Sequence, residues 1–287
     1  MKISEILKRG VPTLSFEVFP PKTQDSYATV QSAVDEIVRL KPDFMSVTFG
    51  AAGNTSKYTL DIAKEILSKG TTPLAHLTCV NSSEAAITEL LNKMREAGVE
   101  NVMALRGDIP AGGETQPRAY RYASELVARI RREGDFCIGA ACYPEGHVES
   151  SGRRQDIAHL KEKVDAGVDF LTTQMFFDNN ILYNFLYQIR EAGITVPVVA
   201  GIMPVTNPKQ IARICVLSGT YLPERFKRIV DRYGDSPAAM LQAGIAYATE
   251  QIIDLYANGV NAVHVYSMNK PRVAAKIRDN LSEIVGK

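Results

Sequence analysis

The stretch LSFEVFPPK, residues 14–22, places a carboxylate in an apolar setting. Glu17 lies between Phe16 and Phe19 in a run that has the pattern of a buried strand, and a Pro-Pro pair ends that run. An ionised carboxylate among aromatic rings loses hydration energy unless it is paired or its pKa rises. Because burial raises the pKa of a carboxyl group, we interpret Glu17 as a proton donor. The alternative, a carboxylate that is ion-paired for structural reasons, stays open.

Other polar side chains stand where further strand-like runs end. Active sites of parallel α/β folds gather at the carboxyl ends of the strands, so these residues are considered together. They are Thr48 in SVTFGA, His76 in AHLTC, Arg106 and Asp108 in LRGD, Tyr143 and His147 in CYPEGH, Gln174 in TTQMFFD, and Tyr266 and Lys270 in HVYSMNK.

Several candidate residues also have a structural interpretation. Asp108 would cap the turn GDIPAGG, because Asp before Pro and Gly is common in loops. His76 and His147 would be core histidines, and Lys163 in LKEKVDAG would be a solvated helix residue.

Two other enzyme classes also stay open. A barrel hydrolase would bind a metal ion through His76, His147, Asp108 and Glu17, and a Schiff-base aldolase would use Lys163, although the helical pattern puts that lysine off the strand ends.

A repeated phrase indicates how the chain positions these groups. REAGVENVMAL, VDAGVDFLTTQ, REAGITVPVVAG and YANGVNAVHVY each contain an amphipathic helical stretch that ends on glycine, and a β-branched strand follows within a few residues. The glycines suit the left-handed position just after a helix, and they are Gly98, Gly167, Gly193 and Gly259.

Eight strands of this kind can be located, at residues 12–19, 43–48, 73–79, 101–106, 136–142, 169–175, 196–202 and 261–267. Helical patterns lie between them, such as SSEAAITELLNKMREAG, with Ser82 or Ser83 as N-cap and an apolar stripe of Ile87, Leu90, Leu91 and Met94. This alternation predicts an α/β fold, an eight-stranded parallel (β/α)8 TIM barrel. A doubly wound open sheet is the alternative, but the Gly-x-Gly-x-x-Gly turn of its nucleotide-binding version is missing after the first strand.

Two regions add helices to the barrel. MKISEILKRG places apolar residues at helical spacing and predicts an extra helix at the amino terminus, and residues 203–260 are long enough for two or three helices before the last strand. No linker or low-complexity segment divides the chain, so we expect a single catalytic domain over residues 1–287.

The first strand has two faces. Period-two alternation puts Ser15, Glu17 and Phe19 on one face, and Phe16 and Val18 on the other. If Phe16 and Val18 pack against helices, Glu17 points into the mouth of the barrel.

Composition favours a small-molecule partner. The 33 Lys and Arg residues nearly balance 32 Asp and Glu, so no charge excess favours nucleic acid or an anionic membrane. We expect a cytoplasmic protein, because there is no signal-peptide pattern and no apolar run near the roughly 20 residues that span a bilayer. The four cysteines show no zinc-ligand spacing, and we interpret them as buried free thiols: Cys79, Cys137, Cys142 and Cys215.

Together the strand-end strings resemble a known family. SFEVFPPK, SVTFGA, LAHLTC, ALRGD, YPEGH, LKEKVDAG, TQMFFD, GIMPV and VYSMNK, in this order and over nearly the whole chain, resemble the flavin-dependent methylenetetrahydrofolate reductases of bacteria. The resemblance implies an FAD-containing barrel that takes a hydride from NADH or NADPH and passes it to 5,10-methylenetetrahydrofolate by ping-pong kinetics. The product is 5-methyltetrahydrofolate, which places the reaction in one-carbon metabolism and methionine supply.

The resemblance also implies roles for individual residues. Glu17 resembles the general acid that helps to open the five-membered ring of the folate, and Asp108 resembles the carboxylate beside flavin and pterin. The residues similar to the flavin contacts of the family are Thr48, His76, Arg106, Gly107, Asp108, Tyr122, Ala141, Tyr143, His147, Asp156 and Lys163. Those similar to its folate and nicotinamide contacts are Glu17, Gln174, Gln210, Tyr266 and Lys270.

The chain departs from the family at four positions. Met175 stands where relatives often have Phe or Leu, Ile214 where some have an aromatic residue, Lys270 where others have Arg, and Val168 where many have Ala. Met175, Ile214 and Lys270 bear on nicotinamide stacking and on the contact with the folate tail, and Val168 bears on flavin affinity. The regulatory domain of the eukaryotic relatives is not expected, nor is feedback inhibition by adenosylmethionine.

A folate-binding module without flavin is a third class, which a visible absorption spectrum separates from the reductase. The electron donor is NADH, NADPH or a partner flavoprotein or ferredoxin, and the absence of an arginine cluster for a 2′-phosphate favours NADH. We expect a homo-oligomer, because family members associate.

Overall fold

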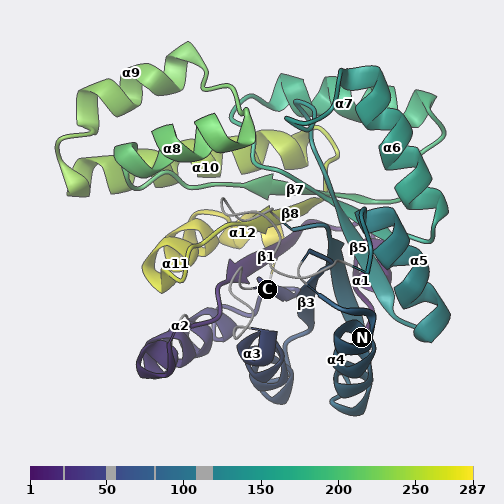
Figure 1. Cartoon of the computed structure of the whole chain (residues 1–287). Helices are drawn as coiled ribbons and strands as arrows, with labels where there is room; N and C mark the ends of the chain where they lie inside the picture. Colours follow the sequence, from purple (N-terminus) through teal and green to yellow (C-terminus); the bar gives the residue numbers. More distant parts are fainter. Residues whose placement is uncertain (22, 50–55, 81, 108–118, 287) are drawn as a thin grey trace.

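Eight parallel strands close into a barrel in the computed structural model of the 287-residue chain, which describes all residues except 22, 50–55, 81, 108–118 and 287. The strands are neighbours in chain order from β1 to β8, and β8 pairs with β1. Helices surround the strands on all sides (Figure 1). The predicted (β/α)8 barrel is therefore confirmed, and the open-sheet alternative is wrong.

Each strand lies within its predicted range and is shorter than that range by one to three residues in total. The strands are β1 (Thr13–Val18), β2 (Met45–Val47), β3 (Pro73–Thr78), β4 (Asn101–Leu105), β5 (Cys137–Cys142), β6 (Phe170–Thr173), β7 (Val198–Ile202) and β8 (Ala262–Val265). In the parallel register, Phe16 on β1 is level with Met45 on β2 and with Val265 on β8.

Helices connect the strands and add to the barrel where the sequence predicted extra segments. They are α1 (Ile3–Leu7), the 3-10 turn η1 (Gln24–Ser26), α2 (Tyr27–Val38), α3 (Ser56–Ser68), α4 (Glu84–Glu96), α5 (Ala123–Glu133), α6 (Arg153–Asp165), α7 (Asn179–Glu191), α8 (Pro208–Ser218), α9 (Glu224–Tyr233), α10 (Pro237–Ala257), α11 (Pro271–Asn280) and α12 (Ser282–Val285). Three helices, α8 to α10, lie between β7 and β8, and they form one side of the molecule, at the upper left of Figure 1.

The repeated helix-glycine-strand phrase has the expected backbone. Gly98, Gly193 and Gly259 have φ angles of 73°, 76° and 79°, in the left-handed region that ends a helix. At the other end of α4, the Ser83 side chain accepts a hydrogen bond from the backbone N–H of Ala86 and caps the helix. Local signals therefore indicate both ends of this helix without reference to tertiary contacts.

Two apolar layers hold the barrel. Phe16 and Val18 lie in the main core between strands and helices, which leaves Ser15 and Glu17 for the interior of the barrel, as the alternation predicted. The second layer fills the amino-terminal end of the barrel, where Ile3 of α1 packs with Phe44 and other buried residues. Since α1 closes that end, the opposite end, where the strands finish, is left for a site.

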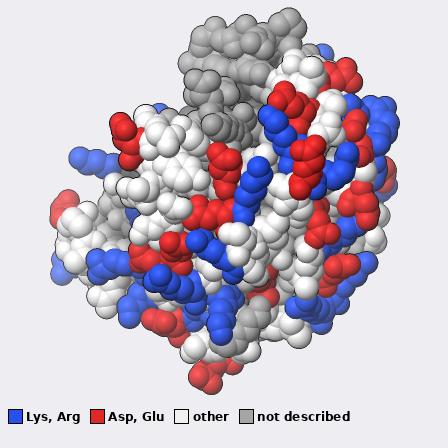
Figure 2. Space-filling model, turned by 90° about the horizontal axis from the view of Figure 1, so that it is seen from below, with Lys and Arg blue, Asp and Glu red and all other residues white. Residues whose placement is uncertain are grey.

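The surface carries both charges. On the face shown in Figure 2, positive and negative side chains are interspersed among uncharged ones. None of the described helices is long and apolar enough to cross a membrane.

All four cysteines are free thiols, and Cys79, Cys137 and Cys142 are buried as expected, whereas Cys215 is half-buried.

Candidate active site

A cavity of about 930 Å³ opens at the carboxyl ends of the strands. Every strand, or the loop after it, contributes to the wall. Met203, directly after β7, is part of the wall although the sequence analysis named no site residue there. Ten of the predicted site residues line this cavity: Glu17, Thr48, His76, Arg106, Gly107, Ala141, Tyr143, His147, Gln174 and Tyr266. The structure therefore brings most of the strand-end residues together.

Glu17 is a buried carboxyl group at the inner end of this cavity. Its Oε2 lies 4.0 Å from Nε2 of His76, and within the described part of the chain its carboxyl makes no hydrogen bond. Burial raises the pKa of Glu17 to about 8 and lowers the pKa of His76 to about 4. At neutral pH the pair is therefore an uncharged acid beside an uncharged imidazole, and the ion-pair interpretation of Glu17 has no charged partner in His76.

Glu17→Gln is expected to stabilise the protein increasingly as the pH rises. The folded-state pKa of Glu17 is raised, so the wild type loses stability between the unfolded value of 4.5 and the folded value of about 8. The loss is at most about 1.4 kcal/mol for each pH unit in this window. Glutamine has no proton to lose, and the histidines are common to both proteins, so the difference in urea unfolding free energy between variant and wild type reports Glu17 alone.

Glu89→Gln is the matched control for this measurement. Glu89 also lines the cavity, but it is exposed, and its pKa is lowered by the hydrogen bond from Lys93. For Glu89→Gln, the difference in unfolding free energy between variant and wild type should stay constant with pH or change slightly in the opposite direction. A free-energy difference for Glu17→Gln that stays constant from about pH 5 to about pH 8 would show that the Glu17 carboxyl titrates normally.

His264 is a site residue that sequence analysis missed. It is buried on β8, and it lines the cavity together with Tyr266. Its Nδ1 lies 2.7 Å from Ser15 Oγ, and its Nε2 lies 2.9 Å from Ser46 Oγ. The period-two alternation of β8, which places residues 264 and 266 on one face, could have indicated it.

Tyr266 and Gln174 each have one hydrogen-bonding atom engaged by the protein. The Tyr266 hydroxyl donates to the carbonyl oxygen of Thr173 at 2.6 Å, so toward a ligand it can only accept. The Gln174 side-chain oxygen accepts from the backbone N–H of Met175 at 2.9 Å, so its amide N–H groups are left to donate. A Cβ at Gly201 would lie 2.4 Å from the Tyr266 hydroxyl, so glycine there leaves room for the tyrosine.

The β4 and β5 side of the cavity carries an arginine and a histidine. Arg106 forms a bidentate ion pair with Glu149, at 2.5 and 2.8 Å. The His147 ring packs edge-on against Tyr143, and its Nδ1 accepts from the backbone N–H of Glu149 at 3.1 Å. Burial, and then the charge of Arg106, lower the pKa of His147, so the neutral ring carries its proton on Nε2. This side of the cavity therefore presents the Arg106 cation and a neutral N–H donor, the Nε2–H of His147.

Four predicted ligand contacts lie away from the cavity wall. Lys163 donates to the carbonyl oxygen of Ala141 at 2.5 Å, and burial lowers the pKa of its amine. Asp156 accepts a hydrogen bond from Ser150, and Lys270 donates to Thr206. The fourth, Tyr122, is half exposed at the start of α5. Their roles toward a ligand stay predictions. Asp108 lies outside the described residues, as does the side chain of Gln210 on α8.

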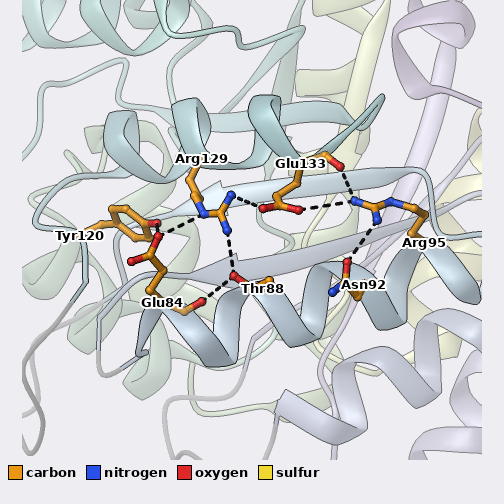
Figure 3. Close-up of polar contacts among 7 residues, drawn as sticks. All are labelled: Glu84, Thr88, Asn92, Arg95, Tyr120, Arg129 and Glu133. Atoms are coloured by element: carbon orange, nitrogen blue, oxygen red, sulfur yellow. Dashed lines mark hydrogen bonds and ion pairs between the residues drawn. The ribbon is translucent and has the colours of Figure 1, made fainter.

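A polar network joins α4 to α5 and to Tyr120, which lies just before α5 (Figure 3). The Arg129 guanidinium pairs with Glu133, donates to Thr88 at 2.9 Å and lies 3.6 Å from Glu84. The Tyr120 hydroxyl donates to the same Glu84 at 3.4 Å. Because the first turn of α4 lines the cavity, this network fixes one of its edges from outside.

The positions that depart from the family have buried or paired side chains. Val168 lies in the main core, and Met175 and Ile214 belong to a separate apolar cluster that includes Phe226 on α9 and Met240 on α10. None of these three lines the main cavity, so their effect on a ligand there is indirect. Among the described residues, no group of three or more His, Cys, Asp and Glu side chains is arranged to hold a metal ion.

Known proteins share this chain's sequence and fold. Residues 2–282 match the family model described as methylenetetrahydrofolate reductase. The chain is 34% identical to the 5,10-methylenetetrahydrofolate reductase of Pectobacterium carotovorum subsp. carotovorum, over 94% of this chain and 90% of that one. It is 36% identical to methylenetetrahydrofolate reductase (NADH) 1 of Arabidopsis thaliana over 99% of its own length, but it spans 50% of that plant protein.

The fold also matches a solved structure. The chain superimposes with a TM-score of 0.68 and 14% identity on an uncharacterized protein from Clostridium thermocellum that binds two copies of 5-methyl-5,6,7,8-tetrahydrofolic acid. The alignment covers 97% of this chain and 98% of that one. At this identity the likeness shows the fold alone.

Proposed function

The chain belongs to the methylenetetrahydrofolate reductase family, and on this premise we propose that it is an FAD-dependent oxidoreductase that reduces 5,10-methylenetetrahydrofolate to 5-methyltetrahydrofolate with NADH or NADPH. The observation that carries the proposal is Glu17, a buried carboxyl group that keeps its proton at neutral pH. It lies in a cavity at the strand ends that is large enough for a cofactor and a substrate.

The residues around the cavity fit a flavin. Gly107 lines the wall with a φ of 85°, and a Cβ there would approach the Thr78 Cβ to 3.0 Å, so glycine lets the chain adopt this turn and pack against Thr78 at the cavity wall. Thr172 lines the same cavity with a buried hydroxyl that has no partner among the described residues. We propose that Arg106 and Lys163 hold the phosphates and that Thr48, His76, Ala141, Tyr143 and His147 contact the rest of the cofactor. Bound FAD would take a hydride from NAD(P)H and give it to the folate, so that the two substrates react in turn.

The residues of the chain divide the remaining work. Opening the five-membered ring needs a proton at the departing nitrogen, which Glu17 can supply in its neutral form. The ring opens to an iminium cation, which the carboxylate of Asp108 would stabilise. Gln174 has amide N–H groups to donate to the pterin or the nicotinamide, and Tyr266 has a hydroxyl oxygen that can accept. We infer that Gln210 and Lys270 contact the folate tail.

Similar proteins support the proposed electron donor and substrate. The plant relatives carry NADH in their names, and together with the missing arginine cluster this favours NADH as the electron donor. The Clostridium thermocellum protein with the same fold binds the product of the proposed reaction. We propose a soluble homo-oligomer that acts in the cytoplasm.

The purified protein is expected to be yellow and to release FAD when it is denatured. Mass spectrometry of the released compound identifies the flavin, after expression with riboflavin supplied. A colourless protein that binds folate would instead be a binding module, and a colourless protein that needs a divalent ion would be a hydrolase. Either outcome would overturn the proposal.

Arg106→Gln tests the proposed phosphate contact. Loss of a hydrogen-bonded charge costs about 1.5 to 3 kcal/mol, so the dissociation constant of FAD should rise about tenfold or more. Arg154→Gln is the control, because Arg154 is exposed on α6. Fluorescence quenching of added FAD measures both constants, and equal constants would remove Arg106 from the site.

A further inference from the structure

His264 is held at both nitrogens and on two sides of its ring. Phe44 stacks on it with ring centroids 5.5 Å apart and planes 7° apart, and Tyr266 meets it edge-on at 5.6 Å. Ser15 Oγ lies 2.7 Å from Nδ1, and Ser46 Oγ lies 2.9 Å from Nε2. The side chain is almost fully buried, so the position of the ring and the partners of both nitrogens are fixed by the protein.

The hydrogen bonds determine which nitrogen carries the proton. Ser15 donates its only hydroxyl proton to the carbonyl oxygen of Val263, at 3.0 Å. With its proton on Val263, Ser15 can only accept from His264, and Nδ1 is then the protonated nitrogen. In the neutral ring Nε2 is then an acceptor, and it receives the hydroxyl proton of Ser46, which makes no other side-chain hydrogen bond within the described residues. Every polar atom of this group is satisfied when the ring is neutral.

This group lies next to the proposed acid. Ser15 precedes Glu17 by two residues on the same face of β1, and Ser46 is the partner of Glu17 in the β1–β2 register. The titratable groups around His264 are His76 on β3, Glu17 on β1 and Tyr266 on β8. A cation at His264 would favour the ionised form of Glu17 and would oppose an iminium cation in the cavity.

We propose that His264 is a positioning residue, fixed as the neutral Nδ1–H tautomer by Ser15 and Ser46, which orients Tyr266 and keeps positive charge away from Glu17. The part that concerns Glu17 rests on the proposed function. Burial, and then His76, lower the pKa of His264 to about 3, in keeping with a ring that stays neutral. The group that His264 orients is the Tyr266 hydroxyl, which donates its proton to the Thr173 carbonyl oxygen.

Nitrogen NMR of the holoenzyme with labelled histidine tests the tautomer without any turnover. The chain has four histidines, and His264→Gln identifies the signals of His264 by their loss. We expect a neutral Nδ1–H ring from about pH 8 down to about pH 5. His147 is the internal contrast, because its Nδ1 is an acceptor and its proton belongs on Nε2. An Nε2–H form of His264, or a charged ring at about pH 6, would overturn the proposal.

Ser46→Ala tests the hydrogen bond at Nε2. Without the Ser46 hydroxyl, Nε2 is a buried acceptor without a donor, so the pKa of His264 should rise by about one to two units from its lowered value, and the ring should begin to take a proton at about pH 5. The half-reaction with folate should then fall about two- to tenfold between about pH 6 and pH 4, because the cation opposes the iminium, whereas the wild type and His264→Gln should stay flat. The half-reaction with NADH is expected to keep its pH dependence.

Thr249→Val is the matched control, because it removes a buried hydroxyl that donates to Ile245 within α10. It should change neither the NMR signals of His264 nor the pH profile. If Ser46→Ala leaves the Nε2 signal and the titration of His264 as in the wild type, or slows both half-reactions equally at every pH, the role of His264 is structural only. If the protein binds no flavin, the proposed function is wrong, but the tautomer of His264 can still be measured by NMR.

Discussion

Glu17→Gln is expected to slow the half-reaction with methylenetetrahydrofolate by about 10²- to 10⁴-fold, the usual cost of losing general acid catalysis. The half-reaction with NADH should continue at nearly the wild-type rate, because it needs no proton at a folate nitrogen. The amide is nearly isosteric with the acid and replaces a carboxyl that is neutral at pH 7, so the fold and the flavin affinity should be kept.

The geometry explains why Glu17 can donate. It has no charged partner in His76, and no described hydrogen bond holds its ionised form, so burial acts unopposed and raises its pKa to about 8. An acid with this pKa is mostly protonated at neutral pH, and it is weak enough to be protonated again between turnovers. The wild-type rate with folate should therefore fall about tenfold for each pH unit above about 8.

Stopped-flow absorbance at the flavin band separates the two half-reactions. Glu89→Gln serves as the control, since it removes another carboxylate from the cavity wall and should change neither rate by more than about twofold. If the Glu17 variant reacts with methylenetetrahydrofolate as fast as the wild type, Glu17 is not the proton donor. Its place in LSFEVFPPK would then have a structural reason.

The fold was predictable because its signals are local. Glycines such as Gly98 and Gly193 end helices through their own backbone preference, and the alternation of β1 separates Phe16 from Glu17 without reference to other strands. Eight repetitions of such a unit leave few ways to bury all the apolar faces. Strand ends were predicted less well, since hydrogen bonding to neighbouring strands decides them.

The site was predictable only where a residue type stood out in its own string. Glu17 is conspicuous among aromatic residues, whereas His264 acquires its role from Ser15 and Ser46, far away in the sequence. The pair of Arg106 and Glu149 likewise joins residues 43 positions apart. Contacts of this kind depend on the closed barrel. The roles of Tyr122, Asp156 and Lys163 came from family resemblance, and the geometry of the chain alone does not bring them to the cavity wall.

Asp108→Asn is expected to slow the half-reaction with folate by about 10²- to 10³-fold, with a much smaller effect on the half-reaction with NADH. Asp108 lies outside the described residues, but it follows Arg106 and Gly107, which both line the cavity. A carboxylate at this point would stabilise the iminium cation that forms when the folate ring opens. Asparagine keeps the size and the turn-forming side chain and removes only the charge.

The comparison between the two half-reactions decides whether the charge of Asp108 acts in the reaction or whether Asp108 only caps the turn. A negative charge matters most where positive charge develops beside it. The iminium forms only in the half-reaction with folate, whereas in the half-reaction with NADH the positive charge develops on the nicotinamide ring. Asp61→Asn is the control, because Asp61 lines the cavity from α3. Equal losses in both half-reactions for Asp108→Asn would mean that Asp108 only caps the turn in GDIPAGG. A selective loss with folate, absent from Asp61→Asn, would place a second carboxyl group beside Glu17 in the reaction, one giving a proton and the other holding the cation.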